Sequence, residues 1–283
     1  MSVENAMLSG RVTITGDDLF YEVRGQGTPL LMIAPGGGDG WQYAQVAERL
    51  ADTFRVITFD RRANGRSTLN PPQNFSIRQQ SEDALAVLRA VGEETAFVFG
   101  NSSGAVIALD LATAHPECVR AVVAHEGPMA RLHPRSARWQ RFFAEVYLTS
   151  FTFGPAWAAL QFMLGAQLPV QPMIKASRGV TAHRKASADP YLSSQTATEV
   201  LIRLELLPVT SYLPDVAALR RSGVRVCLGV SEWGVSKRAW YVEVARQLLE
   251  QLGCALVTFP DHHGAFLDRP AEFADALRAT LTR

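Results

Sequence analysis

The sequence has few cysteines, and their spacing suggests neither a disulfide framework nor a metal site. Only three of its 283 residues are cysteine. They are an odd number and lie far apart, unlike the ligands of a zinc site. Cys118, Cys227 and Cys254 each lie in or beside an apolar run, which indicates reduced, buried thiols. We therefore expect no disulfide, no metal centre and no bound cofactor.

The chain also lacks an excess of charge and any long apolar run. Its formal net charge is +1, and no basic stripe is visible, which argues against nucleic acid as a partner. No run approaches the length of about 18 apolar residues that suggests a membrane span. Residues 1–10 have neither the basic cluster nor the apolar core of a secretory leader. We therefore expect a cytoplasmic protein without membrane contact.

What the chain does have is ample apolar material, at 47% hydrophobic residues. Strands are predicted at the largely apolar segments 30–34, 55–59, 96–99, 119–124, 224–230 and 255–259. The first of these is a continuous apolar run, as expected of a strand covered on both faces. An alternating pair at 11–15 and 19–24 predicts an antiparallel hairpin at a sheet edge. Helical patterns occupy residues 41–50, 76–91, 105–114, 238–252 and 270–281. Strands alternating with helices predict an α/β fold with a mostly parallel, doubly wound sheet.

This alternation breaks between residues 129 and 215. The stretch has no strand-like run, is rich in aromatic residues at helical spacing, and is interrupted by prolines. We predict a helical cap over residues 129–215, inserted after the sixth strand. Residues 1–128 and 216–283 then form the core domain.

The most informative segment is GNSSG, residues 100–104, between the predicted strand 96–99 and the helix 105–114. In that setting G-x-S-x-G is typical of a nucleophile elbow, a strained turn that exposes the middle residue, Ser102, at the edge of the sheet. The N–H of Ser103, at the start of a helix, suits a developing oxyanion. The alternative is a serine-rich turn that only caps the helix.

Ligands of such a sheet bind beyond the carboxyl ends of its strands. After strand 30–34 come three glycines, whose backbone can approach a ligand closely. We assign the second oxyanion N–H to Gly37, with Gly38 as the neighbouring alternative.

A serine nucleophile needs a base with a pKa near 7, and histidine is the usual one. His262 and His263 follow the last predicted strand and precede the last helix. Neighbouring loop residues point in different directions, so only one of them can serve. We favour His263.

The histidine needs a carboxylate that holds its tautomer and balances its charge. Two strand ends offer one: Glu126, after strand 119–124, and Glu232, after strand 224–230. Glu126 lies tightly between a strand end and a turn, where a carboxylate is rarely found without a partner. The sequence favours Glu126 and leaves Glu232 open.

Together these features resemble the α/β-hydrolase superfamily over nearly the whole chain. The resemblance rests on the elbow, on residues 60–67, which are similar to the family's D-x-R-G-x-G-x-S loop, and on His263, Asp268 and Pro270, which match its H-x-x-x-x-[DE]-x-P tail. The chain departs from the family in lacking the usual His-Gly after the third strand. It also lacks the usual Asp after the strand before the last, where Glu232 stands.

A narrower resemblance is to the zearalenone lactonases. They too have a G-x-S-S-G elbow and a His-Glu-x-Pro motif after the next strand, here residues 125–128. In that group the glutamate of the motif is the triad acid, which implies Glu126. The resemblance also implies hydrolysis of a small hydrophobic ester or a bulky lactone.

We therefore expect a serine hydrolase with the triad Ser102, His263 and Glu126 and an oxyanion hole made by Gly37 and Ser103. The alternatives are hydrolysis of a C–C bond next to a ketone, perhydrolysis by the same groups, or a ligand-binding protein that has lost turnover. The sequence leaves open whether the chain forms a homodimer.

The two acid candidates are separated by replacing each with its isosteric amide. We expect Glu126→Gln to lower kcat for ester cleavage by about 10⁴-fold, the scale seen when a triad acid is neutralised, and Glu232→Gln to leave it nearly unchanged. Steady-state kinetics on an aryl ester measures this. The reverse order would move the acid to residue 232.

Overall fold

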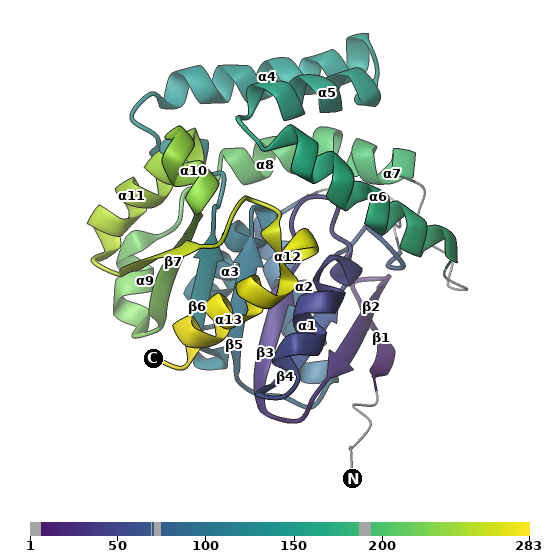
Figure 1. Cartoon of the computed structure of the whole chain (residues 1–283), viewed down its shortest axis with the longest axis vertical. Coiled ribbons are helices and arrows are strands. Elements are labelled where there is room, and N and C mark those ends of the chain that lie inside the picture. Colours follow the sequence, from purple (N-terminus) through teal and green to yellow (C-terminus); the bar gives the residue numbers. More distant parts are fainter. Residues whose placement is uncertain (1–6, 69, 71–74, 187–193) are drawn as a thin grey trace.

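A computed structural model describes residues 7–68, 70, 75–186 and 194–283. Its centre is an eight-stranded sheet of order β1-β2-β4-β3-β5-β6-β7-β8 (Figure 1). The strands are β1 (Leu8–Ile14), β2 (Asp17–Arg24), β3 (Thr28–Ile33), β4 (Phe54–Phe59), β5 (Ala96–Asn101), β6 (Val119–His125), β7 (Arg225–Ser231) and β8 (Ala255–Phe259). The pairs β1–β2 and β2–β4 are antiparallel, and the other neighbouring strands run parallel. The predicted α/β fold, with its mostly parallel sheet and edge hairpin, is confirmed.

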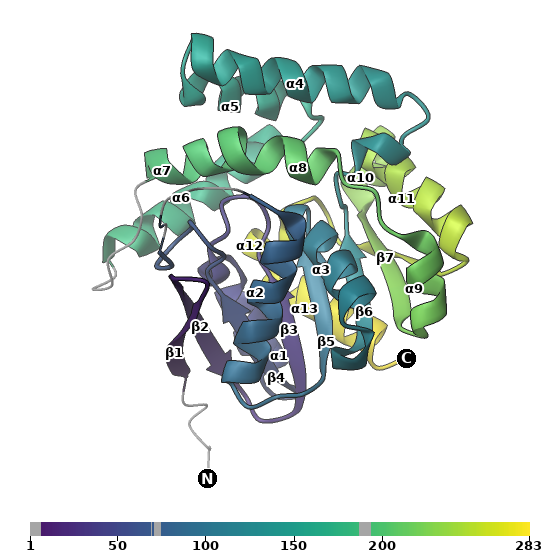
Figure 2. The ribbon, with the colours of Figure 1, turned by 180° about the vertical axis from the view of Figure 1, so that it is seen from behind.

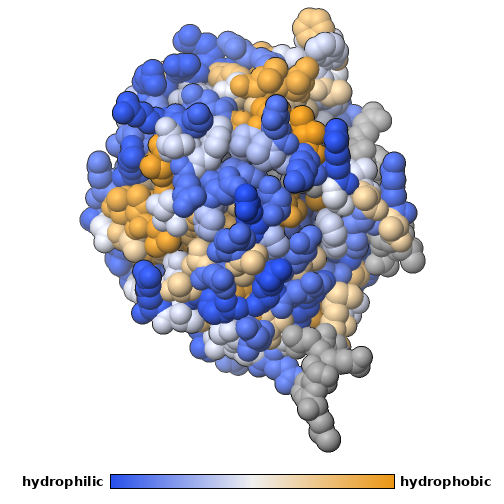
Figure 3. All heavy atoms as spheres, in the orientation of Figure 1, coloured by the Kyte–Doolittle hydropathy of each residue, from blue (hydrophilic) through white to orange (hydrophobic). Residues whose placement is uncertain are grey.

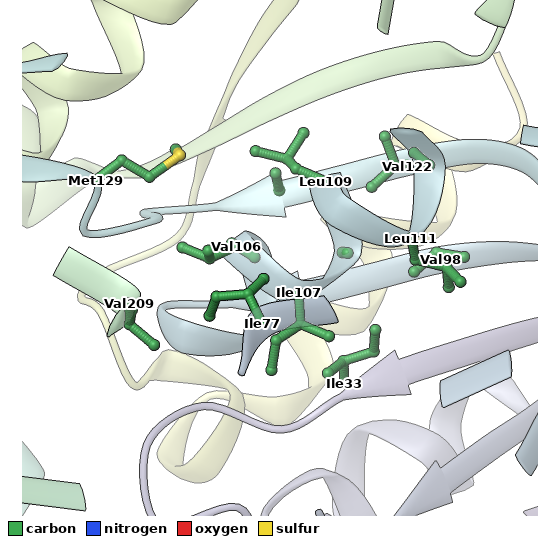
Figure 4. Packing of buried hydrophobic residues seen from close by; sticks show 14 of the residues in the cluster. Ile33, Ile77, Val98, Val106, Ile107, Leu109, Leu111, Val122, Met129 and Val209 are labelled. Atoms are coloured by element: carbon green, nitrogen blue, oxygen red, sulfur yellow. The ribbon is translucent and has the colours of Figure 1, made fainter. Parts of the chain in front are cut away.

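Consecutive residues of the central strands serve two different cores, as the alternation of side chains in a strand requires. Leu30 and Met32 of β3 pack with α1 (Ala44–Leu50) and α13 (Pro270–Leu281) on one face. Ile33 lies on the other face, where Figure 4 shows it beside side chains of α3. That second face is covered by α2 (Ile77–Ala90), α3 (Ser103–Ala114), α9 (Val216–Ser222) and α11 (Trp240–Leu252).

The chain between β6 and β7 forms a layer of helices above one end of the sheet. Its elements are η3 (Ala130–Leu132), α4 (Ser136–Thr152), α5 (Pro155–Gly165), α6 (Val170–Ala186), α7 (Ser194–Glu199), the π-helix η4 (Val200–Glu205) and α8 (Leu206–Thr210). Figures 1 and 2 show α4 and α5 farthest from the sheet, with α6, α7 and α8 beneath them. The described part of 129–215 contains no strand, and residues 187–193 of the predicted cap lie outside the described residues. The proposed domain boundaries stay a prediction.

Two predicted helices begin later than their sequence pattern indicates. Residues 40–43 form the 3₁₀ turn η1 (Gly40–Tyr43) before α1. The helix predicted over 238–252 starts at Trp240, because Arg238 has a left-handed backbone, φ 51°, that ends a separate short helix, α10 (Glu232–Lys237). Another short helix, α12 (Ala265–Asp268), precedes α13. Its four residues are too few to show an apolar periodicity in the sequence.

Apolar side chains gather on the outer surface of the cap, as the orange atoms near the top of Figure 3 show. The exposed ones on or between α4 and α5 are Leu148, Phe151, Phe153, Trp157, Leu160 and Leu164. Within the described residues, no helix combines the length and apolarity needed to cross a bilayer. The three cysteines are unpaired, with Cys118 and Cys227 buried and Cys254 partly buried.

The contact between β5, α3 and β3 leaves no room for a methyl group at Gly104. A Cβ there would lie 2.1 Å from the carbonyl oxygen of Ile33. We expect Gly104→Ala to lower the free energy of unfolding by about 1–3 kcal/mol, the cost of overpacking a close contact. Urea denaturation measures it. Gly179→Ala in α6 is the matched control, since a Cβ there meets nothing within 4 Å, and an equal loss in both variants would contradict the argument.

Candidate active site

Ser102 lies at the turn between β5 and α3, with a backbone that L-residues rarely adopt. Its φ is 54° and its ψ is −119°. The turn closes tightly because both flanking residues are glycine: a Cβ on Gly100 would lie 2.1 Å from the Gly104 carbonyl oxygen. The Ser102 N–H donates to the His125 carbonyl at 2.8 Å, which ties the turn to the end of β6. Strain held by surrounding structure in this way is characteristic of functional turns.

Glu126 and His263 meet at the same end of the sheet, although 137 positions separate them in the chain. His263 Nδ1 lies 2.6 Å from Glu126 Oε2. A carboxylate can only accept, so Nδ1 carries the hydrogen and Nε2 is left as the basic nitrogen. The other carboxylate oxygen, Oε1, accepts the N–H of Ser231 at 2.7 Å and its hydroxyl at 2.6 Å. Both oxygens of this buried carboxylate therefore accept hydrogen bonds.

The two alternatives, Glu232 and His262, have other partners. Glu232 is the first residue of α10, and its Oε2 accepts the Asp261 N–H at 3.0 Å. His262 Nε2 lies 3.2 Å from Asp268 Oδ2. The structure therefore brings Glu126 to His263 and keeps Glu232 and His262 in contacts of their own.

Burial alone would raise the pKa of Glu126, but its neighbours more than offset this effect. The attraction of His125 and His263 and the hydrogen bonds from His263 and Ser231 lower the pKa of Glu126 to about 2. Desolvation lowers the pKa of His125 itself to about 4. Because His125 is then neutral at pH 7, the hydrogen bonds from His263 and Ser231 are what keep Glu126 ionised there.

Asn101 and His125 form a buried layer beneath this group that sequence reasoning missed. The Asn101 amide nitrogen lies 2.6 Å from His125 Nδ1 and donates to the His263 carbonyl at 3.3 Å. It therefore fixes the loop that carries His263. Ser231 was missed too, although its place one residue after a predicted strand was the available signal.

The glycine turn after β3 is formed by Gly36, Gly37 and Gly38. Gly36 lines the pocket described below, whereas Gly37, the predicted donor, is next to it with φ 85° and is not among the lining residues. The N–H of Gly38 donates to the Pro35 carbonyl at 2.9 Å, so this alternative donor is already engaged. Ser103, the first residue of α3, lines the pocket with Gly36.

A pocket of about 130 Å³ lies between this end of the sheet and the cap. A single water needs only about 10–15 Å³, so there is room for an organic group. Ser102 and His263 both line it, and most of its walls are apolar: Phe143, Phe162, Leu168, Met173, Leu201, Leu206, Val209, Trp240, Phe266 and Leu267. The hydrogen bonds among the described residues do not include one between the Ser102 hydroxyl and His263. Such bonds are often long until a substrate binds.

The lowered pKa of His125 predicts acid sensitivity. Between pH 6.5 and 4 the unfolded chain binds a proton at this residue that the folded chain does not, so stability falls as the pH falls. We expect the free energy of unfolding to drop by about 2 kcal/mol from pH 7 to pH 5 through this group. Urea denaturation at both pH values measures it. His125→Gln should flatten this dependence and His115→Gln, in a partly exposed site, should not; an unchanged slope in His125→Gln would refute the assignment.

Comparison with known proteins supports the same architecture. Residues 29–162 match the family model described as the alpha/beta hydrolase fold. A relative from Bacillus subtilis, named "Uncharacterized hydrolase YraK", is 28% identical over 278 residues, covering 97% of this chain and 96% of its own.

Two solved structures extend the comparison to nearly the full length. A thermophilic esterase from Thermogutta terrifontis is 19% identical, with a TM-score of 0.75, over 97% of this chain and 98% of its own. The enol-lactonase from Burkholderia xenovorans LB400 is 18% identical, with a TM-score of 0.68, over 97% of this chain and 100% of its own. At such identities the likeness concerns the fold. Together with the family match, it shows that the chain has the α/β-hydrolase fold.

Proposed function

We propose that the protein is a serine hydrolase that cleaves carboxylic esters through an acyl-enzyme, with Ser102 as nucleophile, His263 as general base and Glu126 as the acid that orients it. The observation that carries the proposal is the 2.6 Å hydrogen bond from His263 to Glu126 in a pocket that Ser102 also lines. This bond leaves the Nε2 of His263 free of a hydrogen. An imidazole nitrogen of that kind is the base that a serine hydroxyl requires at neutral pH.

The steps follow from these groups. Ser102 Oγ attacks the carbonyl carbon while His263 Nε2 takes its proton, and Glu126 stabilises the imidazolium. The C–O bond then breaks, and the proton passes from His263 to the leaving alkoxide. In a lactone this new hydroxyl remains attached to the acyl group. Water attacks the acyl-enzyme by the same route in reverse and releases a carboxylic acid and free Ser102.

The negative oxygen of the tetrahedral intermediate needs hydrogen-bond donors that are already in place. We assign the Ser103 N–H as one donor, because the first N–H groups of a helix have no partner inside it. The second comes from the glycine turn after β3, where we keep Gly37 as the donor. Its neighbour Gly36 lines the pocket, which is consistent with a carbonyl oxygen resting on this turn.

For the substrate, we propose a hydrophobic ester, and a bulky lactone in particular. The apolar walls of the pocket come largely from the cap, and the ring of Phe143 in the cap packs against Trp240 of α11. The short motifs shared with the zearalenone lactonases favour a lactone as well. Apolar walls favour an apolar substrate because its transfer out of water is favourable.

We expect Ser102→Ala to abolish ester and lactone cleavage, with a loss of at least about 10³-fold, since no other hydroxyl can replace the nucleophile. Hydrolysis of an aryl ester and labelling by a fluorophosphonate probe measure this, and circular dichroism checks the fold. Ser236→Ala, on the exposed side of α10, is the matched control and should retain both signals. Near-full activity in Ser102→Ala would end the proposal, and an unlabelled wild-type serine would favour a binding protein.

A further inference from the structure

The apolar pocket contains one carboxylate that the proposed chemistry does not use. Glu205 lines the pocket and its side chain is fully buried. One of its oxygens, Oε1, accepts a hydrogen bond from Arg61 Nη2 at 2.7 Å, in an ion pair in which neither side chain has any exposed surface. The other oxygen, Oε2, has no hydrogen-bond donor among the described residues. An unsatisfied buried acceptor is costly, and more so when it is charged.

This carboxylate lies close to the proposed oxyanion turn. The same Arg61 nitrogen that binds Glu205 also donates to the Pro35 carbonyl at 2.9 Å, one residue before Gly36. The helix that carries Glu205 packs against the turn directly, because a Cβ on Gly36 would lie 2.7 Å from a methyl group of Leu201. A ligand whose carbonyl oxygen rests on this turn would therefore present its neighbouring atoms to Glu205.

The backbone here is also unusual. Glu205 ends η4 (Val200–Glu205), a π-helix, and such segments are rare and frequently found at functional sites. The nearby hydroxyl of Thr210 donates to the Leu206 carbonyl at 2.7 Å. Asn101 Oδ1 is a second unpartnered oxygen, but its amide is bound to His125 and to the His263 backbone at the triad. Among the described cap residues that line the pocket, Glu205 is thus the one with an acceptor that lacks a donor.

We propose that Glu205 is a specificity-determining residue: its Oε2 accepts a hydrogen bond from a neutral hydroxyl or N–H group on the acyl part of the substrate, close to the scissile carbonyl. Arg61 already balances the charge of the carboxylate, so the pair favours a neutral donor over a cation. The substrate class becomes a hydrophobic ester or lactone with one polar donor near its carbonyl. This inference rests on the proposed ester hydrolysis.

The first test uses the wild-type protein and five phenyl esters: those of butyric, 3-hydroxybutyric, 3-methoxybutyric, 3-acetamidobutyric and 3-aminobutyric acid. Each kcat/KM is divided by the rate of alkaline hydrolysis of the same ester, which removes differences in intrinsic reactivity. We expect the hydroxy or the acetamido ester to exceed the butyrate, methoxy and ammonium esters by about tenfold to a hundredfold, the worth of one hydrogen bond to a charged acceptor. The order of the hydroxy and acetamido esters tells which donor the site takes. Equal values for all five, or a preference for the ammonium ester, would overturn the inference.

The second test replaces the acceptor. Glu205→Gln puts an NH₂ group or a neutral oxygen where the carboxylate was, so we expect the ratio of the donor ester to the butyrate to fall by about tenfold or more. Glu199→Gln, six residues earlier and partly exposed, is the matched control and should keep the wild-type ratio. An unchanged ratio in Glu205→Gln would mean that the carboxylate only supports the cap. If this variant does not fold, the wild-type series decides alone.

The two proposals fail in different ways. Loss of all activity in Ser102→Ala, together with no preference among the wild-type esters, would overturn only the role of Glu205. Activity that survives in Ser102→Ala would overturn the ester hydrolysis itself, and the substrate class with it.

Discussion

A single buried carboxylate joins three strand ends of this protein at the proposed active site. Glu126 follows β6, its Oε1 binds the end of β7 through Ser231, and its Oε2 binds His263 in the loop after β8. A charge in such a place is stable only if its hydrogen bonds are made. The same contacts therefore hold three strand ends in register and keep the imidazole in one tautomer. The arrangement of the strand ends and the orientation of the imidazole thus depend on the same hydrogen bonds.

The elbow imposes a second constraint, and it is steric. Ser102 keeps its strained backbone because glycines at positions 100 and 104 allow strand, helix and β3 to approach within distances that a methyl group would prevent. Its N–H is bound to the carbonyl of His125, the residue just before Glu126. Ser102 and Glu126, the proposed nucleophile and acid, are thus tied to the same strand end, so a shift of β6 would displace both.

Much of this arrangement could be predicted from the sequence because strong local signals carry it. Short, largely apolar segments indicated the parallel strands, and the glycine-bounded turn marked Ser102 between a strand and a helix. The choice between Glu126 and Glu232 could not be made from spacing, since both follow strands. It depends on where α10 begins: Glu232 is drawn into its first turn and binds the backbone of Asp261.

Contacts over long separations left no local signal. Arg61 belongs to the loop after β4, and Glu205 belongs to the cap, 144 positions later. Neither segment has a sequence pattern that indicates their ion pair. The layer of Asn101 and His125 was missed for a related reason. A buried polar residue at a strand end looks like a turn residue until its partner is known. The helix predicted from residue 238 begins at Trp240, because the left-handed backbone of Arg238 ends the separate short helix α10.

The pairing of Ser231 with Glu126 determines where a carboxylate can stand at this end of the sheet. β6 and β7 are parallel neighbours, and the hydroxyl of Ser231 lies 2.6 Å from the carboxylate. A carboxylate carried by residue 231 would therefore lie beside the position that the Glu126 carboxylate occupies. The fold thus offers two neighbouring strand ends from which a carboxylate can approach the same imidazole.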